Sequence, residues 1–220
     1  MRPVDLRLYA LLDPETRGSH QLDDLARLIA PSATLVQLRD KRSETRQMVG
    51  YACDLQAVLS DAGVPFVIND RVDVALAAGT AGVHVGQDDM DTRDARRLLG
   101  ADAIIGLSLK TVQEAANAPL DLLTYVAIGG VFATQSKNNT KAPVGIQGFK
   151  TILAEVRKRA PKMPVVAIAG IDVSNAGEVI AAGADGVAVI SALSKAADPA
   201  KAARDLRAVV DAALKKRGSR

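Results

Sequence analysis

The sequence predicts an α/β fold of the (β/α)8 class, a single-domain TIM barrel spanning residues 1–220. Short apolar segments alternate with helical patterns along the chain, and such repeated units are typical of a parallel sheet. Eight units fit into this length, and eight is the number that closes a barrel. Hydrophobic residues make up 48% of the chain but aromatic residues only 3%, so an aliphatic core suits strands buried on both faces.

The expected strands are short apolar runs bounded by turn residues. They lie at residues 8–12, 34–38, 65–68, 82–85, 103–107, 123–128, 164–169 and 186–190. The expected helices fall between these runs, at residues 21–30, 44–62, 72–78, 92–99, 111–117, 148–160, 174–182 and 199–216. Glycine follows three of the helices, at Gly63, Gly79 and Gly183, where a left-handed residue commonly ends a helix. These short turns are expected at the amino-terminal face of the barrel.

A doubly wound open sheet is the alternative fold. Such a fold often carries a glycine-rich dinucleotide turn after its first strand. Here the first strand is followed by Asp13-Pro14-Glu15-Thr16 instead. The sequence therefore favours the barrel.

Composition excludes several classes of function. The net charge is only +3, and no basic run is interleaved with aromatic residues, so nucleic acid is not an expected partner. No apolar run is long enough to span a membrane, and no apolar block of a signal peptide follows Met1. The single cysteine, Cys53, cannot form an internal disulfide and is expected to be an inert core residue. These observations predict a cytoplasmic protein.

Polar residues collect just after the expected strands, where the active site of this fold lies. Asp70 and Asp89 each follow a strand, and parallel strands bring their carboxyl ends to one edge. Two carboxylates that face one another repel unless a cation lies between them, and this pair suits Mg²⁺. The alternative is that Asp70 caps the next helix. Asp89 has no such role, because Asp91 begins the helix that follows it.

Two further segments suit phosphate groups. The long stretch from Gly129 to Gly145 is expected to be a lid or binding loop, and plain disorder is its alternative. Within it Thr134, Ser136 and Lys137 offer two hydroxyl groups and an ammonium. After the last two strands come Gly170 and Ser191, where barrels often hold a phosphate on backbone N–H groups.

His84 lies in the middle of a strand and has no second histidine spaced for a metal. It is expected to be a hydrogen-bonded interior residue more than a catalytic one. No Ser–His–acid arrangement is detectable, so the sequence offers no candidate for a protein nucleophile.

Six short motifs, in order and each at a strand end, resemble the thiamine phosphate synthase (thiamine-phosphate pyrophosphorylase) family. They are Gln37-Leu38-Arg39-Asp40-Lys41, Asn69-Asp70, His84-Val85-Gly86-Gln87-Asp88-Asp89 with Gly106-Leu107-Ser108, Thr134-Gln135-Ser136-Lys137, Ala169-Gly170 and Ile190-Ser191. The resemblance extends from about Leu8 to Leu193. It implies that the chain joins a pyrimidine methyl diphosphate to a thiazole ethyl phosphate, giving thiamine phosphate and pyrophosphate.

The resemblance also implies roles for individual residues. It assigns the pyrimidine diphosphate to Gln37, Leu38, Arg39, Asp40, Lys41, Asn69, Ser108 and Lys137. It assigns the thiazole phosphate to Thr134, Gln135, Ser136, Gly170, Ile190 and Ser191. Asp70 and Asp89 would bind Mg²⁺, and Arg39, Lys41 and Lys137 would be the catalytic residues. The family's dissociative mechanism needs no protein nucleophile, which agrees with finding none.

The chain departs from the family pattern at three positions. Ser136 replaces a threonine, and Ala169 stands where the family commonly has the first of two glycines, which matters only if that position needs a positive φ. Lys110 replaces an expected His or Asn and has no assigned role.

Two other functions are alternatives, a thiazole tautomerase-like isomerase and a non-catalytic binder of thiamine phosphate. The isomerase would need neither the pyrimidine diphosphate residues nor the magnesium residues. The sequence leaves open the thiazole form, carboxylated or not, and whether the chain forms a homo-oligomer.

Overall fold

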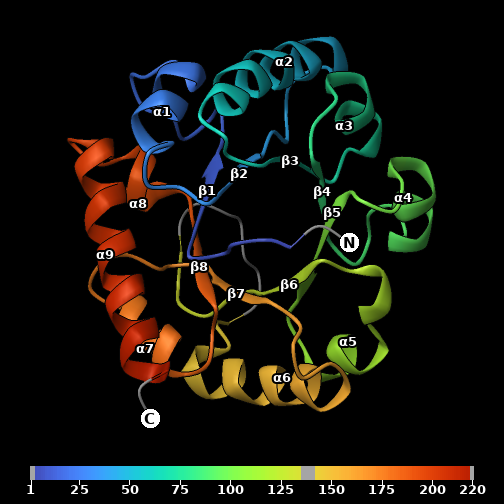
Figure 1. The fold of residues 1–220 in the computed structure, drawn as a ribbon, viewed down its shortest axis with the longest axis vertical. Helices are drawn as coiled ribbons and strands as arrows, with labels where there is room; N and C mark the ends of the chain where they lie inside the picture. Colours follow the sequence, from blue (N-terminus) through green and yellow to red (C-terminus); the bar gives the residue numbers. More distant parts are fainter. Residues whose placement is uncertain (1–2, 135–141, 219–220) are drawn as a thin grey trace.

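Eight parallel strands form a closed barrel surrounded by helices (Figure 1), as the sequence predicts. The computed structural model describes residues 3–134 and 142–218. Each strand pairs with the next in sequence, and β8 pairs with β1 to close the sheet. The alternative of an open, doubly wound sheet is therefore wrong.

The elements lie close to their predicted positions. The strands are β1 (Leu8–Leu12), β2 (Leu35–Leu38), β3 (Phe66–Asn69), β4 (Gly82–Val85), β5 (Ile104–Leu109), β6 (Tyr125–Ile128), β7 (Val165–Ile168) and β8 (Gly186–Val189). The helices are α1 (Leu22–Ile29), α2 (Thr45–Asp61), α3 (Val72–Ala78), α4 (Thr92–Leu99), α5 (Val112–Asn117), η1 (Leu120–Leu122), α6 (Gly145–Arg159), α7 (Ala176–Ala181), α8 (Ser191–Ser194) and α9 (Pro199–Gly218). The short helices η1 and α8 are not anticipated by the sequence, because four residues or fewer carry no readable period.

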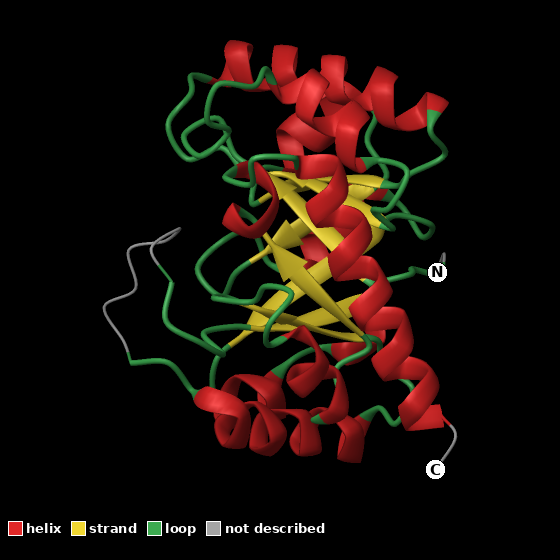
Figure 2. Cartoon of the chain, turned by 90° about the vertical axis from the view of Figure 1, so that its left-hand side faces the viewer, coloured by secondary structure: helices red, strands yellow, loops and turns green. Residues whose placement is uncertain are grey.

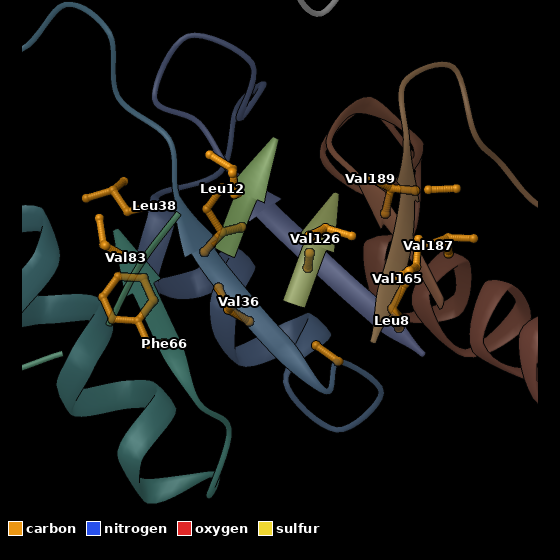
Figure 3. Packing of buried hydrophobic residues seen from close by; sticks show 14 of the residues in the cluster. Leu8, Leu12, Val36, Leu38, Phe66, Val83, Val126, Val165, Val187 and Val189 are labelled. Carbon is orange, nitrogen blue, oxygen red and sulfur yellow. The ribbon is translucent and has the colours of Figure 1, made fainter. Parts of the chain in front are cut away.

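Alternate residues of each strand point to opposite faces of the sheet, so the hydrophobic core has two layers. In β1 every residue is buried; Leu8 and Leu12 face the helices, whereas Tyr9 and Leu11 belong to the barrel interior. The outer layer between sheet and helices is almost wholly aliphatic, and Figure 3 shows part of it. The interior layer is smaller and contains both buried tyrosines. Phe66 and Phe149 belong to the outer layer, so the interior is distinguished by its two buried tyrosines, whose hydroxyl groups bring polar atoms into it.

The two ends of the barrel differ. Leu6, which precedes β1, is 3% exposed and packs into the interior cluster, so the N-terminal segment closes the bottom. Figure 2 shows the strands from the side, with the N-terminus at this closed end and long loops at the other. The open end therefore has room for a site.

One expectation about the surface is wrong. Cys53 is exposed on α2 and is not a core residue, because the neighbouring helix positions Ala52 and Leu55 fill the core face. In the described parts of the chain, no helix combines the length and the apolar character needed to cross a membrane.

Candidate active site

A cavity of about 550 Å³ opens at the carboxyl end of the barrel. Eight residues expected at the site line it: Gln37, Arg39, Asn69, Ser108, Thr134, Gly170, Ile190 and Ser191. Five others lie outside its lining: Leu38, Asp40, Lys41, Asp70 and Asp89. Gln135, Ser136 and Lys137 lie outside the described residues.

Two of those five, Leu38 and Asp40, stabilise the β2 segment and the turn that follows it. The side chain of Leu38 is 1% exposed and packs in the outer core, facing away from the cavity. Asp40 Oδ1 accepts hydrogen bonds from the backbone N–H groups of Arg42 (3.0 Å) and Ser43 (2.9 Å). Any contact of Leu38 with a ligand must therefore use its backbone, while Asp40 orders the turn that leads into α2.

Arg39 is held in the cavity wall by a buried acid. Its guanidinium forms an ion pair with Asp13, whose side chain is only 1% exposed. Asp13 also accepts a hydrogen bond from the backbone N–H of Glu15 at 2.9 Å, which fixes the carboxylate in the turn after β1. Asp13 is absent from the predicted site, although its place directly after the first strand is the signal that could have found it.

Asp70 and Asp89 share one edge of the mouth, as predicted. Burial raises the pKa of Asp70, the ion pair with Lys41 lowers it, and the neighbouring Asp89 carboxylate raises it again. Asp89 Oδ2 in turn accepts a hydrogen bond from Gly86 N at 2.7 Å. Two acids and one ammonium thus lie at the ends of β2, β3 and β4.

The capping alternative for Asp70 is not supported. Helix α3 begins after Arg71, and its N-cap makes no side-chain hydrogen bond. The expected cap of α4 is present, since Asp91 accepts a hydrogen bond from Arg93 N at 2.7 Å. Asp89 is therefore not needed to begin α4, and it accepts its hydrogen bond from Gly86 N, outside that helix.

The edge acids fit one kind of metal site. The described residues contain no group of three or more His, Cys, Asp or Glu side chains that could hold a metal ion. Asp70 and Asp89 alone suit Mg²⁺, which commonly takes one or two carboxylates and completes its shell with water and substrate phosphate. Burial is the largest cause of the raised pKa of Asp70, and the neighbouring Asp89 carboxylate raises it further by a repulsion that a cation would relieve. These two residues could therefore hold Mg²⁺ beside a phosphorylated ligand.

The opposite side of the mouth is built from backbone. Ala169 has a φ of 89° and Gly170 a φ of 65°. A Cβ on Gly170 would lie 2.4 Å from the carbonyl oxygen of Ala133. Asn175 Nδ2 donates to the Gly170 carbonyl at 2.9 Å, so the turn after β7 is held in place.

The positive φ of Ala169 answers a question that the sequence left open. This position does require the left-handed region, which costs an alanine about 1–2 kcal/mol. Phe132 N donates to the Ala169 carbonyl at 3.1 Å, a bond that helps hold the strained residue. Beyond it, Ile190 and Ser191 lead into α8, and both line the cavity.

Two further cations stand at the cavity. Lys110 and Lys195 line it, and both are exposed. Neither forms an ion pair with another described residue. Lys195 lies outside the predicted site because it follows α8, a helix that the sequence does not reveal.

A polar chain crosses the barrel interior at the floor of the cavity, where Tyr9 and His84 are among the lining residues. Tyr9 Oη and Tyr125 Oη are 2.7 Å apart, and Gln37 Nε2 donates to Tyr9. His84 Nδ1 lies 2.9 Å from Tyr125 Oη, and His84 Nε2 lies 2.9 Å from Ser108 Oγ. His84 is thus an interior hydrogen-bonded residue, as expected. Neither tyrosine is part of the predicted site, since a lone tyrosine in a strand resembles ordinary packing.

Comparisons with known proteins agree with this geometry. The family model described as thiamine monophosphate synthase matches residues 8–193. The thiamine-phosphate synthase of Agrobacterium fabrum is 52% identical, covering 99% of both chains. That of Chloroflexus aurantiacus is 44% identical, covering 97% of this chain and 96% of its own.

Solved structures support the same relationship. The thiamine phosphate pyrophosphorylase from Pyrococcus furiosus is similar with a TM-score of 0.81 and 34% identity, covering 96% of this chain and 98% of its own. A 3-hexulose-6-phosphate synthase is similar in fold alone, with a TM-score of 0.63 and 17% identity.

Proposed function

The chain belongs to the thiamine monophosphate synthase family, and from this premise we propose that it is a thiamine-phosphate synthase with two phosphorylated substrates. It is an enzyme of the transferase class. The proposed reaction joins an aminopyrimidine methyl diphosphate to a thiazole ethyl phosphate and releases thiamine phosphate and pyrophosphate. We place this step of thiamine biosynthesis in the cytoplasm, since a single cysteine leaves no internal disulfide to form.

The observation that carries the proposal is one cavity with two unlike sides. Arg39, Asn69 and Ser108 line it on one side, next to the edge that holds Lys41 and the two acids. Gly170 and Ser191 line it on the other side, where the main chain approaches closely. Two phosphorylated substrates that react with one another need two such anion-binding sides around one space.

The residue types suit a dissociative transfer. The bond between the pyrimidine methylene carbon and the diphosphate oxygen breaks, and the electron pair leaves with pyrophosphate. Arg39, Lys41 and Lys137 would stabilise the charge that develops on it, and the electron-rich aminopyrimidine would carry the cation. Mg²⁺ held by Asp70 and Asp89 would neutralise part of the same charge.

The second half of the reaction needs only positioning. The thiazole nitrogen donates its lone pair to the methylene carbon and forms the new bond. Its phosphate would be held by the backbone at Gly170, Ile190 and Ser191. The family resemblance assigns the same phosphate to Thr134 and also to Gln135 and Ser136, which lie outside the described residues. Holding both reactants in one cavity supplies much of the acceleration, so no protein nucleophile is required.

A turnover assay tests the proposal. Both substrates are mixed with the protein and Mg²⁺, and pyrophosphate and thiamine phosphate are measured. A synthase forms both products in equal amounts and stops when a chelator is added. A tautomerase-like isomerase would change the thiazole phosphate without releasing pyrophosphate, and a non-catalytic binder would form no product. Either of those outcomes would contradict the proposal.

A further inference from the structure

The side chain of Asn175, at the end of the loop between β7 and α7, forms two hydrogen bonds within that loop. Its Oδ1 accepts a hydrogen bond from Asp172 N at 3.0 Å, and its Nδ2 donates to the Gly170 carbonyl at 2.9 Å. The partners fix which amide atom is which, because a backbone N–H only donates and a carbonyl only accepts. Both ends of the amide are therefore used inside the loop.

Helix capping does not explain these two bonds. Asparagine is a preferred N-cap residue, and Asn175 occupies the N-cap position of α7. Its side chain nevertheless forms no capping hydrogen bond with that helix. The amide donates instead to Gly170, which lines the cavity. The role of this side chain therefore lies in the loop at the cavity wall, not in the helix.

Two consecutive carbonyl groups after β7 are held by residues that do not line the cavity. Phe132 N donates to the Ala169 carbonyl at 3.1 Å. Asn175 Nδ2 donates to the Gly170 carbonyl. Both peptides are trans, and in a trans peptide the C=O and the following N–H point in opposite directions. The N–H of Gly170 therefore points away from Phe132, and the N–H of Ile171 points away from Asn175.

The two N–H groups are available to a ligand. Neither Gly170 N nor Ile171 N donates a hydrogen bond to another described residue, and both residues line the cavity. The loop has no room to shift toward β6, since a Cβ on Gly170 would lie 2.7 Å from Phe132 Cβ. Successive backbone N–H groups that converge in a turn form a site for an anion. The orientation of the peptide between Gly170 and Ile171 thus decides whether this turn offers a donor or an acceptor.

We propose that Asn175 is a positioning residue for the thiazole phosphate, since its amide keeps the Ile171 N–H turned toward the cavity. This inference rests on the proposed function, in which the same loop binds that phosphate. Without the amide, the peptide after Gly170 can rotate, because glycine tolerates most backbone conformations. Rotation would turn the Gly170 carbonyl oxygen toward the phosphate, and two acceptors repel. Asn175 therefore contributes to phosphate affinity without touching the ligand.

Steady-state kinetics of Asn175→Ala provide the first test. The KM for thiazole phosphate should rise about tenfold, the effect of one lost hydrogen bond to a charged group. The kcat should stay within a few-fold of the parent value, because the phosphate is held alike in the ground state and the transition state. The KM for the pyrimidine diphosphate should not change. A residue needed only for folding would instead reduce the amount of active protein, which lowers kcat without raising one KM selectively.

Two further variants separate the amide from its surroundings. Ser174→Ala is the matched control, because Ser174 lies in the same loop and its hydroxyl donates to Asp172 Oδ1 at 2.5 Å and not to Gly170. It should keep the parent KM. Asn175→Asp stands in if Asn175→Ala does not fold, since it keeps an acceptor for Asp172 N but places an oxygen against the Gly170 carbonyl. Its loss of affinity relative to the parent should persist in about 0.5 M salt, where repulsion between the new charge and the phosphate is largely screened.

Nuclear magnetic resonance keeps the test independent of turnover. In the parent, the backbone amide proton of Ile171 should move downfield when inorganic phosphate is added, because its N–H forms a charge-assisted hydrogen bond. In Asn175→Ala this movement should be much smaller. If the movement depends on Asn175 but the protein forms no thiamine phosphate, the proposed function fails and this inference stands. A folded Asn175→Ala with the parent KM for thiazole phosphate, or an Ile171 amide that phosphate does not move in the parent, would overturn it.

Discussion

The two sides of the barrel mouth differ in the groups that they offer to a phosphorylated ligand. At the ends of β2 and β3, side chains carry the charge, and Lys41 is balanced by Asp70. At the end of β7 backbone groups would meet the ligand, because Ala169 and Gly170 adopt left-handed backbone conformations. A charge on a side chain can be removed while the fold remains. A backbone site depends on conformation, so it can be removed only by moving the chain.

The largest effect is expected from removing a carboxylate at the ends of β2, β3 and β4 while leaving the backbone side unchanged. Asp89→Ala should lower turnover by orders of magnitude, because the departing pyrophosphate loses part of its stabilisation. Thiazole phosphate should still bind within a few-fold of the parent, measured by calorimetry without pyrimidine. Asp88→Ala is the matched control, since Asp88 is an exposed neighbouring acid and should turn over normally.

Two results would contradict this separation of the two sides. Full turnover of Asp89→Ala in Mg²⁺ would show that Asp89 does not bind metal and serves only its bond to Gly86 N. Loss of thiazole phosphate binding in the folded variant would show that the two sides act as one.

Breaking the backbone side should cost stability as well as binding. Gly170→Ala places a Cβ 2.4 Å from Ala133 O at a φ of 65°, so the loop must shift. The strained backbone should lower the free energy of unfolding by about 1–3 kcal/mol. Thiazole phosphate affinity should also fall, by about tenfold or more, because the loop that would hold the phosphate has shifted. Mg²⁺ binding should be unchanged. Urea unfolding and calorimetry measure these effects.

Gly79→Ala separates clash from strain in that experiment. Gly79 has a φ of 62°, close to that of Gly170, but a Cβ there meets nothing within 4 Å. It should lose stability through strain alone and keep full thiazole phosphate affinity. Equal losses of stability in the two variants would mean that the contact with Ala133 O is unimportant.

A smaller effect on substrate binding is expected from uncoupling Arg39 from Asp13, although the cost in stability is larger. Asp13→Asn leaves the guanidinium without its buried partner, and breaking such a pair typically costs on the order of 3–5 kcal/mol of stability. Arg39 retains some exposure, 13%, so the lower end is expected. The pyrimidine diphosphate KM should also rise, because Arg39 loses its fixed position.

The surface pair of Arg27 and Asp23 supplies the control for this variant. Its side chains are 56% and 37% exposed, so Asp23→Asn should change stability by about 0.5 kcal/mol or less. If Asp13→Asn costs no more than this, Asp13 does not position Arg39 through a buried charge.

The smallest effect is expected from a substitution that removes backbone strain at the end of β7 without disrupting the loop. Ala169→Gly relieves the left-handed alanine and should raise the free energy of unfolding by about 0.5–1 kcal/mol, after the entropy that glycine adds to the unfolded chain. Turnover and thiazole phosphate affinity should stay near the parent values. A loss of stability would mean that the surrounding loop, held by Phe132 N, compensates the strain fully.

Much of the fold and part of the site follow from local patterns. Alternating apolar strands and periodic helices predict the barrel, because each element must bury its apolar face against the next. Strand ends then predict Arg39, Asn69, Ser108 and Ser191 as a group, since the carboxyl ends of parallel strands meet on one face. The facing acids Asp70 and Asp89, found close together, follow from the same rule.

The remaining features depend on contacts that the order of residues does not contain. Asp13 and Arg39 are separated by 26 positions, and Tyr9 and Tyr125 by 116. Hydrogen bonds over such separations exist only after the sheet closes and sets the register of neighbouring strands. Local periodicity therefore determined the barrel and the face that carries the site. Closure of the barrel decided which buried polar groups meet inside it, because pairing there is a property of three-dimensional packing and not of sequence spacing.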